Sequence, residues 1–298
     1  MGVDLEGVKA LRQETGLGFV HCKKALDEAE GNREQAIILL RKKGMAAADR
    51  RAHRAADQGM IALYISPEKS SGALVEMRCE TDFVARGDDF IGLASELAKL
   101  AGGLEPGKVE KEMFLGQSAG AGKGSVQDEV KTLGGRVGEK VEMHRVASLP
   151  PPGTDRHRVG GYVHHNGKSG ALVRIGYKSE ATGATLDEVL KNLAMHIVAH
   201  VPPPVAVSKD DVPEEVVEKE RAIQADTDEI KKKPEKIRGK ILEGKMQRFL
   251  RDLALLEQPL VTVTDGKVPV REVLEKHGKD LSDSLVVEGF LRFELGGE

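Results

Sequence analysis

A short internal repeat is the feature of this sequence that most constrains its fold. The segment Gly72–Met77 (GALVEM) recurs 98 residues later as Gly170–Ile175 (GALVRI). In the first copy, apolar Val75, Met77 and Cys79 alternate with charged residues, and this period of two indicates a half-buried strand. A shorter candidate strand precedes each copy, and apolar residues at helical spacing follow each one. We therefore expect one sheet-plus-helix scaffold to be used twice.

The turn that follows the first copy carries the most unusual side chain. Thr81-Asp82-Phe83 lies where a strand passes into a helix. That helix has two candidate starts, one capped by Thr81 or Asp82 and the other at Gly87-Asp88-Asp89. Phe83 is an aromatic residue among charged neighbours, in a chain with 3% aromatic residues.

Two interpretations of Phe83 are open. In the first, the ring folds back and fills the local core, as turn aromatics usually do. In the second, it points outward and has a function there. The second copy has Ser179-Glu180-Ala181 at the equivalent place, so the scaffold folds without an aromatic residue there. This favours the outward interpretation.

Three stretches of the chain resemble signatures of the bacterial elongation factor Ts family. They are Cys79–Arg86 (CETDFVAR), Arg12–Leu26 (RQETGLGFVHCKKAL) and Gly289–Glu294 (GFLRFE). Because they lie near the middle, start and end, the resemblance covers essentially the whole chain. It implies a guanine nucleotide exchange factor that acts on the GTPase elongation factor Tu. Such a protein has no catalytic residues and no cofactor of its own.

The same resemblance implies which residues touch the partner. Thr81, Asp82, Phe83 and Val84 would disturb the partner's Mg²⁺ and phosphate site, with the Phe83 ring as a wedge. In the N-terminal region, the matching positions are Arg12, Phe19 and Val20; a core role for Phe19 is the alternative. In the second repeat, the partner-contacting histidine corresponds to His164.

The predicted fold class is α+β, in four parts. The expected parts are a three-helix ubiquitin-associated-like module with a linker helix (1–54), a first core subdomain (55–147), a second core subdomain (148–211 and 257–298) and an inserted antiparallel coiled-coil hairpin (212–256). The second subdomain is expected to contain a strand over Leu260–Val263, a helix over Val270–His277 and a last strand over Gly289–Leu295 that rejoins the sheet.

The hairpin is predicted from apolar spacing. Val216, Ile223 and Ile230 repeat every seven residues, and Lys231–Pro234 forces a reversal because proline cannot continue a helix interior. The hairpin either packs on its own protein or projects and touches the partner or a second copy. A homodimer through the core or through this arm therefore stays open.

Charge limits the other classes of ligand. The formal net charge is −3 with the two signs nearly balanced, whereas a nucleic-acid binder usually has a basic excess. The basic stretch Arg41–Arg54 is interpreted as a solvated helical linker, with a nucleic-acid contact as the second interpretation. The segment Gly116–Ser125 is only superficially like a phosphate-binding loop. Gln117 replaces the first glycine and Gly124 replaces the Ser or Thr that would bind Mg²⁺, so we expect a flexible loop.

The compartment is predicted from what the chain carries. No window approaches the ~20 apolar residues of a membrane helix, and Met1–Glu6 lacks the pattern of a secretory leader. Cys22 and Cys79 lie in separate apolar segments, where buried free thiols are the default in a reducing cytosol. A cytoplasmic protein without membrane contact is expected.

Two other functions compete with nucleotide exchange. One is an enzyme with a metal held by His164, His165 and His196; His196 and His200 have metal-ligand spacing on a helix, but no third ligand is evident. The other is a ubiquitin-associated-type adaptor for an unrelated partner. Neither is favoured over the interaction protein, and no metal is expected.

Overall fold

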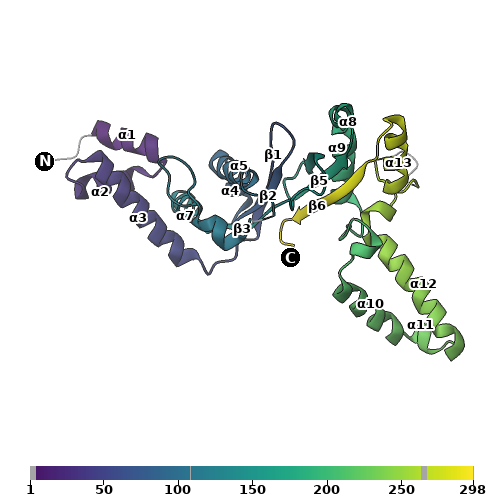
Figure 1. Cartoon of the computed structure of the whole chain (residues 1–298). Coiled ribbons are helices and arrows are strands. Elements are labelled where there is room, and N and C mark those ends of the chain that lie inside the picture. Colours follow the sequence, from purple (N-terminus) through teal and green to yellow (C-terminus); the bar gives the residue numbers. More distant parts are fainter. Residues whose placement is uncertain (1–4, 108, 263–266, 298) are drawn as a thin grey trace. The chain divides into compact units, whose positions relative to one another are not determined.

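The computed structural model describes residues 5–107, 109–262 and 267–297 of the chain, and the described part is an α+β protein (Figure 1). It divides into two compact units. Unit 1 comprises Met1–Tyr64, Leu74–Ala147 and Phe293–Glu298, and unit 2 comprises Ile65–Ala73 and Ser148–Arg292. The leader question at Met1–Asp4 and the end of the strand predicted at Val263 lie outside the described residues.

The elements follow one another in the order labelled in Figure 1. They are α1 (Leu5–Thr15), α2 (Phe19–Glu28), α3 (Arg33–Arg51), β1 (Gln58–Ile65), β2 (Gly72–Cys79), α4 (Asp82–Ala85), α5 (Asp88–Gly102), α6 (Lys111–Gly116), α7 (Val126–Val137), β3 (Val141–Ser148), β4 (Arg156–Val163), β5 (Ser169–Tyr177), α8 (Glu180–Thr185), α9 (Asp187–Ala199), η1 (Lys209–Asp211), α10 (Glu214–Asp226), α11 (Asp228–Lys231), α12 (Glu235–Leu253), η2 (Leu255–Glu257), α13 (Val270–Asp280) and β6 (Val286–Glu294).

The first three helices form a small core of their own. Val8, Leu11, Cys22, Leu26 and Leu40 are among its buried members. Their spacing of three and four residues places them on one face of each helix. The turns between the helices use Gly16 and Gly31 at positive φ, where a residue with a Cβ would be strained. The three helices predicted for this region are therefore confirmed.

Helix α3 continues past this core and packs on α7. A Cβ on Gly135 would lie 2.7 Å from the Cα of Gly44, so two glycines let the helices approach closely. Ion pairs flank the crossing, from Arg41 to Glu129 at 2.6 Å and from Lys131 to Asp49 at 2.7 Å. The basic stretch is helical, as predicted, but it is not a linker solvated on every side, because one face of α3 rests on α7.

The first sheet has the strand order β1-β2-β3. Its central strand β2 was expected to be half-buried, with Glu76 facing solvent, and this was wrong: Glu76 is 0% exposed. Its carboxylate accepts hydrogen bonds from Arg78 and Arg145 at 2.6 Å each and from the backbone N–H of Gly296 at 3.2 Å. Arg145 also stacks over the ring of Phe293. The second face of β2 is covered because its charge is neutralised there.

The second sheet repeats this order as β4-β5-β6. Strands β4 and β5 are antiparallel, in a register from Arg156 opposite Tyr177 to Val163 opposite Gly170. Helix α9 packs on them through residues such as Leu190 and Ile197. The last strand joins the sheet beside β5, as predicted. At the position equivalent to Glu76, Arg174 is also buried, and it pairs with Glu288 at 2.7 Å.

The predicted hairpin is present. Figure 1 shows α10 and α12 side by side, and the chain reverses between α11 and Glu235. Lys245 on α12 reaches back to Glu229, and Ile230 and Met246 are buried between the helices. Ile223 and Ile237 remain 51% and 43% exposed, so the hairpin leaves part of its apolar surface in water.

The strand predicted over Leu260–Val263 was wrong in its described part, 260–262, which is irregular and turn-like. Only Pro259 and Pro269 form an isolated bridge there. Proline has no N–H for a ladder, and the N–H of Val261 is used by a side chain, the Nδ1 atom of His196. Leu260 is buried because it fills the core of unit 2.

The glycine-rich segment Gly116–Ser125 closes on itself. Ser118 and Ser125 form an isolated bridge, and Gly120 and Gly122 have positive φ. Lys123 is paired with Glu96. A lysine that would contact phosphate is thus held by a carboxylate, in line with the expected loop. None of the described helices combines the length and apolar character that crossing a bilayer requires.

Candidate functional site

The chain leaves β2 through a tight turn that contains both of the predicted helix starts. Thr81 is the N-cap of the one-turn helix α4, and its hydroxyl accepts a hydrogen bond from the N–H of Val84 at 3.4 Å. Gly87 is the N-cap of α5, which begins at Asp88. The two alternatives left open by the sequence are therefore both used. The break between the helices leaves residues 82–85 as a separate projection.

A carboxylate from another part of unit 1 holds this turn in place. Oε2 of Glu139 accepts a hydrogen bond from the backbone N–H of Thr81 at 3.0 Å, and Oε1 accepts one from the Thr81 hydroxyl at 2.7 Å. Because the hydroxyl donates to Glu139, its lone pair stays directed at the Val84 N–H. Glu139 lies between α7 and β3, so the third strand of the sheet positions the turn.

The second unit repeats this device. The carboxylate of Asp283, between α13 and β6, accepts hydrogen bonds from the N–H groups of Lys178 and Ser179 and from the Thr182 hydroxyl. Ser179 is the N-cap of α8, which corresponds to α4. These bonds to the ionised form lower the pKa of Asp283 to about 2. The anchor is therefore part of the repeated scaffold, and the aromatic residue is not.

Phe83 projects from the anchored turn. Its side chain belongs to the large hydrophobic residues that are exposed, and it is 85% exposed. The core below is closed by Phe90, which is 1% exposed and belongs to α5. Filling the core is therefore not what Phe83 does in this structure. Asp82 beside it is half-exposed and pairs with Arg86 at 3.2 Å, so a charged pair borders the ring.

The base of the turn is electrostatically fixed. The carboxylate of Glu80 accepts the N–H of Lys140 at 2.6 Å and pairs with Arg54, and the hydrogen bond from Lys140 is the main cause that lowers its pKa. Burial, with a smaller contribution from Glu139, raises the pKa of the Cys79 thiol to about 12. Cys79 is thus a protonated core residue that donates to the carbonyl of Thr81, and it has no nucleophilic role.

The predicted N-terminal residues lie on the first two helices. Arg12 is exposed in the last turn of α1, and Phe19 and Val20 open α2. Phe19 is 36% exposed and Val20 is 62% exposed. Neither belongs to the buried core of the three helices. The three side chains are therefore available at the junction of α1 and α2, on different elements from the Phe83 turn.

His164 lies in unit 2, immediately after β4. Its Nδ1 atom is 3.1 Å from the hydroxyl of Tyr162, and its ring lies 4.2 Å from that of His165. The segment His165-Asn166-Gly167 is the hairpin turn between β4 and β5, with Gly167 at positive φ. His164 is partly exposed and is held by its neighbour on the strand.

The proposed histidine metal site is not formed. His196 is 0% exposed, its Nε2 lies 2.9 Å from Oε1 of Gln258, and its Nδ1 accepts the N–H of Val261 at 3.3 Å. Both ring nitrogens are thus engaged, and burial lowers the pKa of His196 to about 4. Within residues 5–107, 109–262 and 267–297, no group of three or more His, Cys, Asp or Glu side chains is arranged to hold a metal ion.

Glu139 was not among the residues predicted from sequence. Its counterpart Asp283 is 144 residues away, because the hairpin is inserted before the second anchor, so a search at the offset of 98 residues passes over the pair. The usable signal was positional. Each carboxylate lies two or three residues before the last strand of its sheet.

Comparison with known proteins gives a consistent result. Residues 80–297 match the model of the family described as Elongation factor TS. The chain is similar to Elongation factor Ts of Prosthecochloris aestuarii, with 38% identity over 296 residues that cover 99% of each chain. It is also similar to Elongation factor Ts of Chlorobium phaeobacteroides, with 36% identity over 99% of each chain. With that of Nautilia profundicola, the identity is 38% over 97% of this chain and 91% of the relative.

Proposed function

The chain belongs to the elongation factor Ts family, and from this premise we propose that it is a guanine nucleotide exchange factor in translation elongation. It binds elongation factor Tu in its GDP form and promotes GDP release so that GTP can bind. Its own residues catalyse no chemical step. The protein works in the cytoplasm.

The observation that carries the mechanism is the exposed Phe83 on its anchored turn. Leaving such a ring in water forgoes about 1.5–3 kcal/mol of burial energy, and the ring is 85% exposed. An apolar crevice on a partner recovers that energy. Because Glu139 and the Thr81 cap fix the backbone, little conformational entropy is lost on insertion. Phe83 therefore acts as a preformed wedge.

The wedge changes the affinity of the partner for GDP through linkage. A GTPase holds GDP through its phosphates, a phosphate-binding loop and Mg²⁺. A protein that binds the Mg²⁺-free or nucleotide-free form more tightly weakens GDP by the same factor, because the coupling is reciprocal. Roughly 4–6 kcal/mol of coupling shifts the equilibrium about a thousand- to ten-thousand-fold. Phe83 separates elements near the Mg²⁺ site, Asp82 engages backbone or cations there, and Thr81 and Val84 set the turn.

Further contacts hold the partner while the wedge acts. Arg12, Phe19 and Val20 form an exposed set on the N-terminal helices, and we assign to them the contact with the partner's nucleotide domain. His164 supplies a contact from the second unit. Apolar side chains at the centre of an interface contribute most of the binding energy, so Phe19 and Val20 are the anchors of this second contact.

We extend the proposal to the architecture. The four parts are a ubiquitin-associated-like module (1–54), two core subdomains related by duplication (55–147, and 148–211 with 257–298) and an inserted hairpin (212–256). The shared strand order and the paired anchors Glu139 and Asp283 support the duplication. The exposed Ile223 and Ile237 support a hairpin that contacts either the partner or a second copy, which would give a homodimer.

A nucleotide-release assay tests the proposal. Elongation factor Tu loaded with a fluorescent GDP analogue is mixed with the chain and excess GDP in a stopped-flow instrument. The proposal predicts a release rate that rises with the concentration of the chain and saturates. A flat rate at concentrations where the two proteins form a complex would show that the chain is a binding protein without exchange activity.

A further inference from the structure

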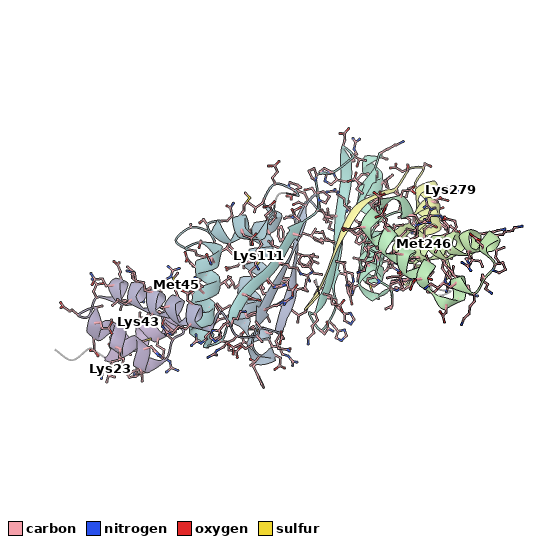
Figure 2. The ribbon with its side chains drawn as sticks, turned by 90° about the horizontal axis from the view of Figure 1, so that it is seen from below. Lys23, Lys43, Met45, Lys111, Met246 and Lys279 are labelled. Atoms are coloured by element: carbon pink, nitrogen blue, oxygen red, sulfur yellow. The ribbon has the colours of Figure 1, made fainter. Side chains whose placement is uncertain are left out.

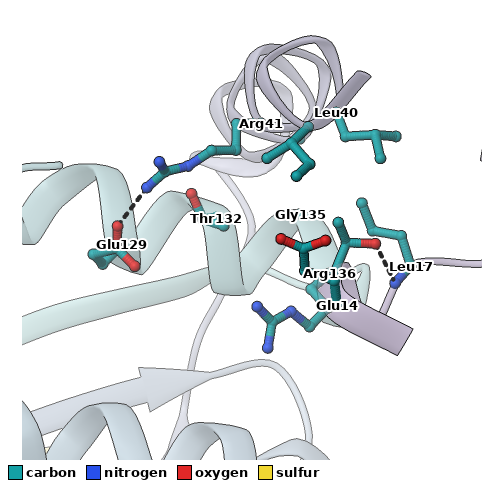
Figure 3. Close-up of a pocket in the computed structure, with 11 residues that line it drawn as sticks. Glu14, Leu17, Leu40, Arg41, Glu129, Thr132, Gly135 and Arg136 are labelled. Carbon is teal, nitrogen blue, oxygen red and sulfur yellow. Dashed lines mark hydrogen bonds and ion pairs between the residues drawn. The ribbon is translucent and has the colours of Figure 1, made fainter. Parts of the chain in front are cut away.

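Two hollows lie against the crossing of α3 and α7 in unit 1, and they differ in charge. The smaller has a volume of about 190 Å³ and is shown in Figure 3. Two carboxylates, Glu14 and Glu129, and two guanidinium groups, Arg41 and Arg136, line it. The pair Arg41–Glu129 spans it at 2.6 Å. This hollow is neutral by itself and needs no ligand for its charge.

The larger hollow has a volume of about 580 Å³, and no Asp or Glu is among its lining residues. Its charged or titratable lining residues come from α2, α3 and α7, and they are His21, Lys24, Lys43, Arg50, Arg51 and Arg136. Figure 2 shows Lys43 on the ribbon of α3. Five permanent positive charges around one hollow, in a chain with a net charge of −3, are a local concentration of one sign. Like charges that converge in this way favour a bound anion.

Only part of this charge is neutralised by the chain. Lys43 pairs with Glu28, and Arg136 pairs with Asp89. Within the part of the chain that the structure describes, no carboxylate pairs with Lys24, Arg50 or Arg51, and the Nη1 atom of Arg51 is buried without any hydrogen-bond partner. Glu80, which senses the charge of Arg51, is already bonded to Arg54 and to the N–H of Lys140. An unsatisfied buried donor is costly, and an anionic oxygen in the hollow would satisfy it.

The spacing within the helices explains why these charges converge. His21 and Lys24 are three residues apart on α2, and Lys43, Ala47 and Arg50 follow one face of α3. Gly18, the N-cap of α2, also borders the hollow and has no side-chain cap. The C-terminal cap of α7, Gly138, borders it as well. The two helix dipoles, each about half a charge and of opposite sign, offset one another, so the cationic side chains decide.

We infer that this hollow is a binding site for a compact polyphosphate anion. Guanidinium and ammonium groups that converge from three helices match the several oxygens of a di- or triphosphate group. A hollow of about 580 Å³ lies within the size range of small-molecule sites. The concave shape favours a compact polyphosphate, free or carried by a nucleoside, over an extended nucleic-acid backbone. The site is separate from the Phe83 turn and does not depend on the exchange activity.

Calorimetric titration of the full-length chain with inorganic tripolyphosphate tests the inference. A parallel titration with ATP asks whether a nucleoside-borne triphosphate binds in the same way, and a single-stranded RNA of about ten nucleotides asks whether a backbone does. At constant ionic strength, we expect saturable binding of tripolyphosphate to one site. If tripolyphosphate fails to bind, or if the RNA binds and tripolyphosphate does not, the inference is wrong.

The chain offers matched control variants. Lys24→Ala and Arg51→Ala each remove one lining charge and should weaken tripolyphosphate binding by about tenfold or more, the factor expected for one charge-assisted hydrogen bond. Lys23→Ala and Lys42→Ala remove the same charge from α2 and α3 at positions that do not line the hollow. These controls should change binding less than twofold. Equal losses in test and control variants would mean that tripolyphosphate responds to net charge alone, and would overturn the site.

Discussion

The anchor beneath the Phe83 turn makes the sharpest prediction, because the same device occurs in the second unit without the aromatic residue. Glu139 accepts the N–H and the hydroxyl of Thr81 at 3.0 and 2.7 Å. Glutamine at this position offers one acceptor instead of two and no charge. Since a hydrogen bond to a charged group contributes about 1.5–3 kcal/mol, Glu139→Gln should lower the free energy of unfolding by about 2 kcal/mol.

The same substitution should slow nucleotide release. If about half of that energy holds the turn where Phe83 can insert, release slows about fivefold at saturating concentration of the variant. The assay is stopped-flow release of a fluorescent GDP analogue from elongation factor Tu. Circular dichroism and urea titration verify that the variant is folded. Glu139→Asp, which keeps the charge, should recover part of the rate.

Asp283→Asn is the matched control. It weakens the equivalent anchor of α8, so it should reduce stability while leaving the release rate within about twofold of the wild type. The reasoning is refuted if Asp283→Asn slows release as much as Glu139→Gln does. A folded Glu139→Gln protein with wild-type release would refute it equally.

Other consequences concern stability and the N-terminal contact. His196 has a folded pKa of about 4 against 6.5 for the free side chain, so only the unfolded state takes up its proton as the pH falls between these values. Wild-type stability should therefore be complete above pH 6.5 and decline by up to about 3 kcal/mol towards pH 4, and His196→Gln should lack this component in pH-dependent urea titrations. Glu76→Gln leaves Arg78 and Arg145 without their carboxylate and should cost about 3 kcal/mol; a loss below about 1 kcal/mol in urea would contradict the buried pairing. Val20→Asp places a charge on an exposed apolar position and should weaken complex formation at least tenfold at an unchanged melting temperature, as measured by calorimetry; unaltered affinity would remove Val20 from the interface.

Local patterns were sufficient for much of the fold. The repeat at 98 residues predicted the central strands of both sheets, and the order β1-β2-β3 recurs as β4-β5-β6. The cap at Thr81 and the second start at Gly87 were both visible in the sequence. The reversal before Pro234 followed from the chemistry of proline alone.

Long-range contacts decided what the sequence left unresolved. Glu76 resembled a solvent-facing strand residue, and its burial depends on Arg145 and on the chain end near Gly296, far away in sequence. The strand over Leu260–Val263 was expected from apolar residues, but the side chain of His196 takes the N–H of Val261. Glu139 could not be recognised because its importance lies in a bond to Thr81, 58 residues earlier.

The exposure of Phe83 follows the expectation that its ring points outward, whereas its action on a partner is a proposal. One substitution tests that action most directly. Phe83→Ala should keep the fold, because the ring is 85% exposed. Met113→Ala is a matched control, since it truncates another exposed apolar side chain of unit 1 at a distance in sequence from the turn.

The decisive measurement is the saturating rate at which each variant releases a fluorescent GDP analogue from elongation factor Tu. The wedge predicts that Phe83→Ala slows release about tenfold or more, a loss of about 1.4 kcal/mol or more of transition-state stabilisation, while Met113→Ala keeps the wild-type rate. If Phe83→Ala stimulates release as strongly as the wild type does, the ring is not the wedge.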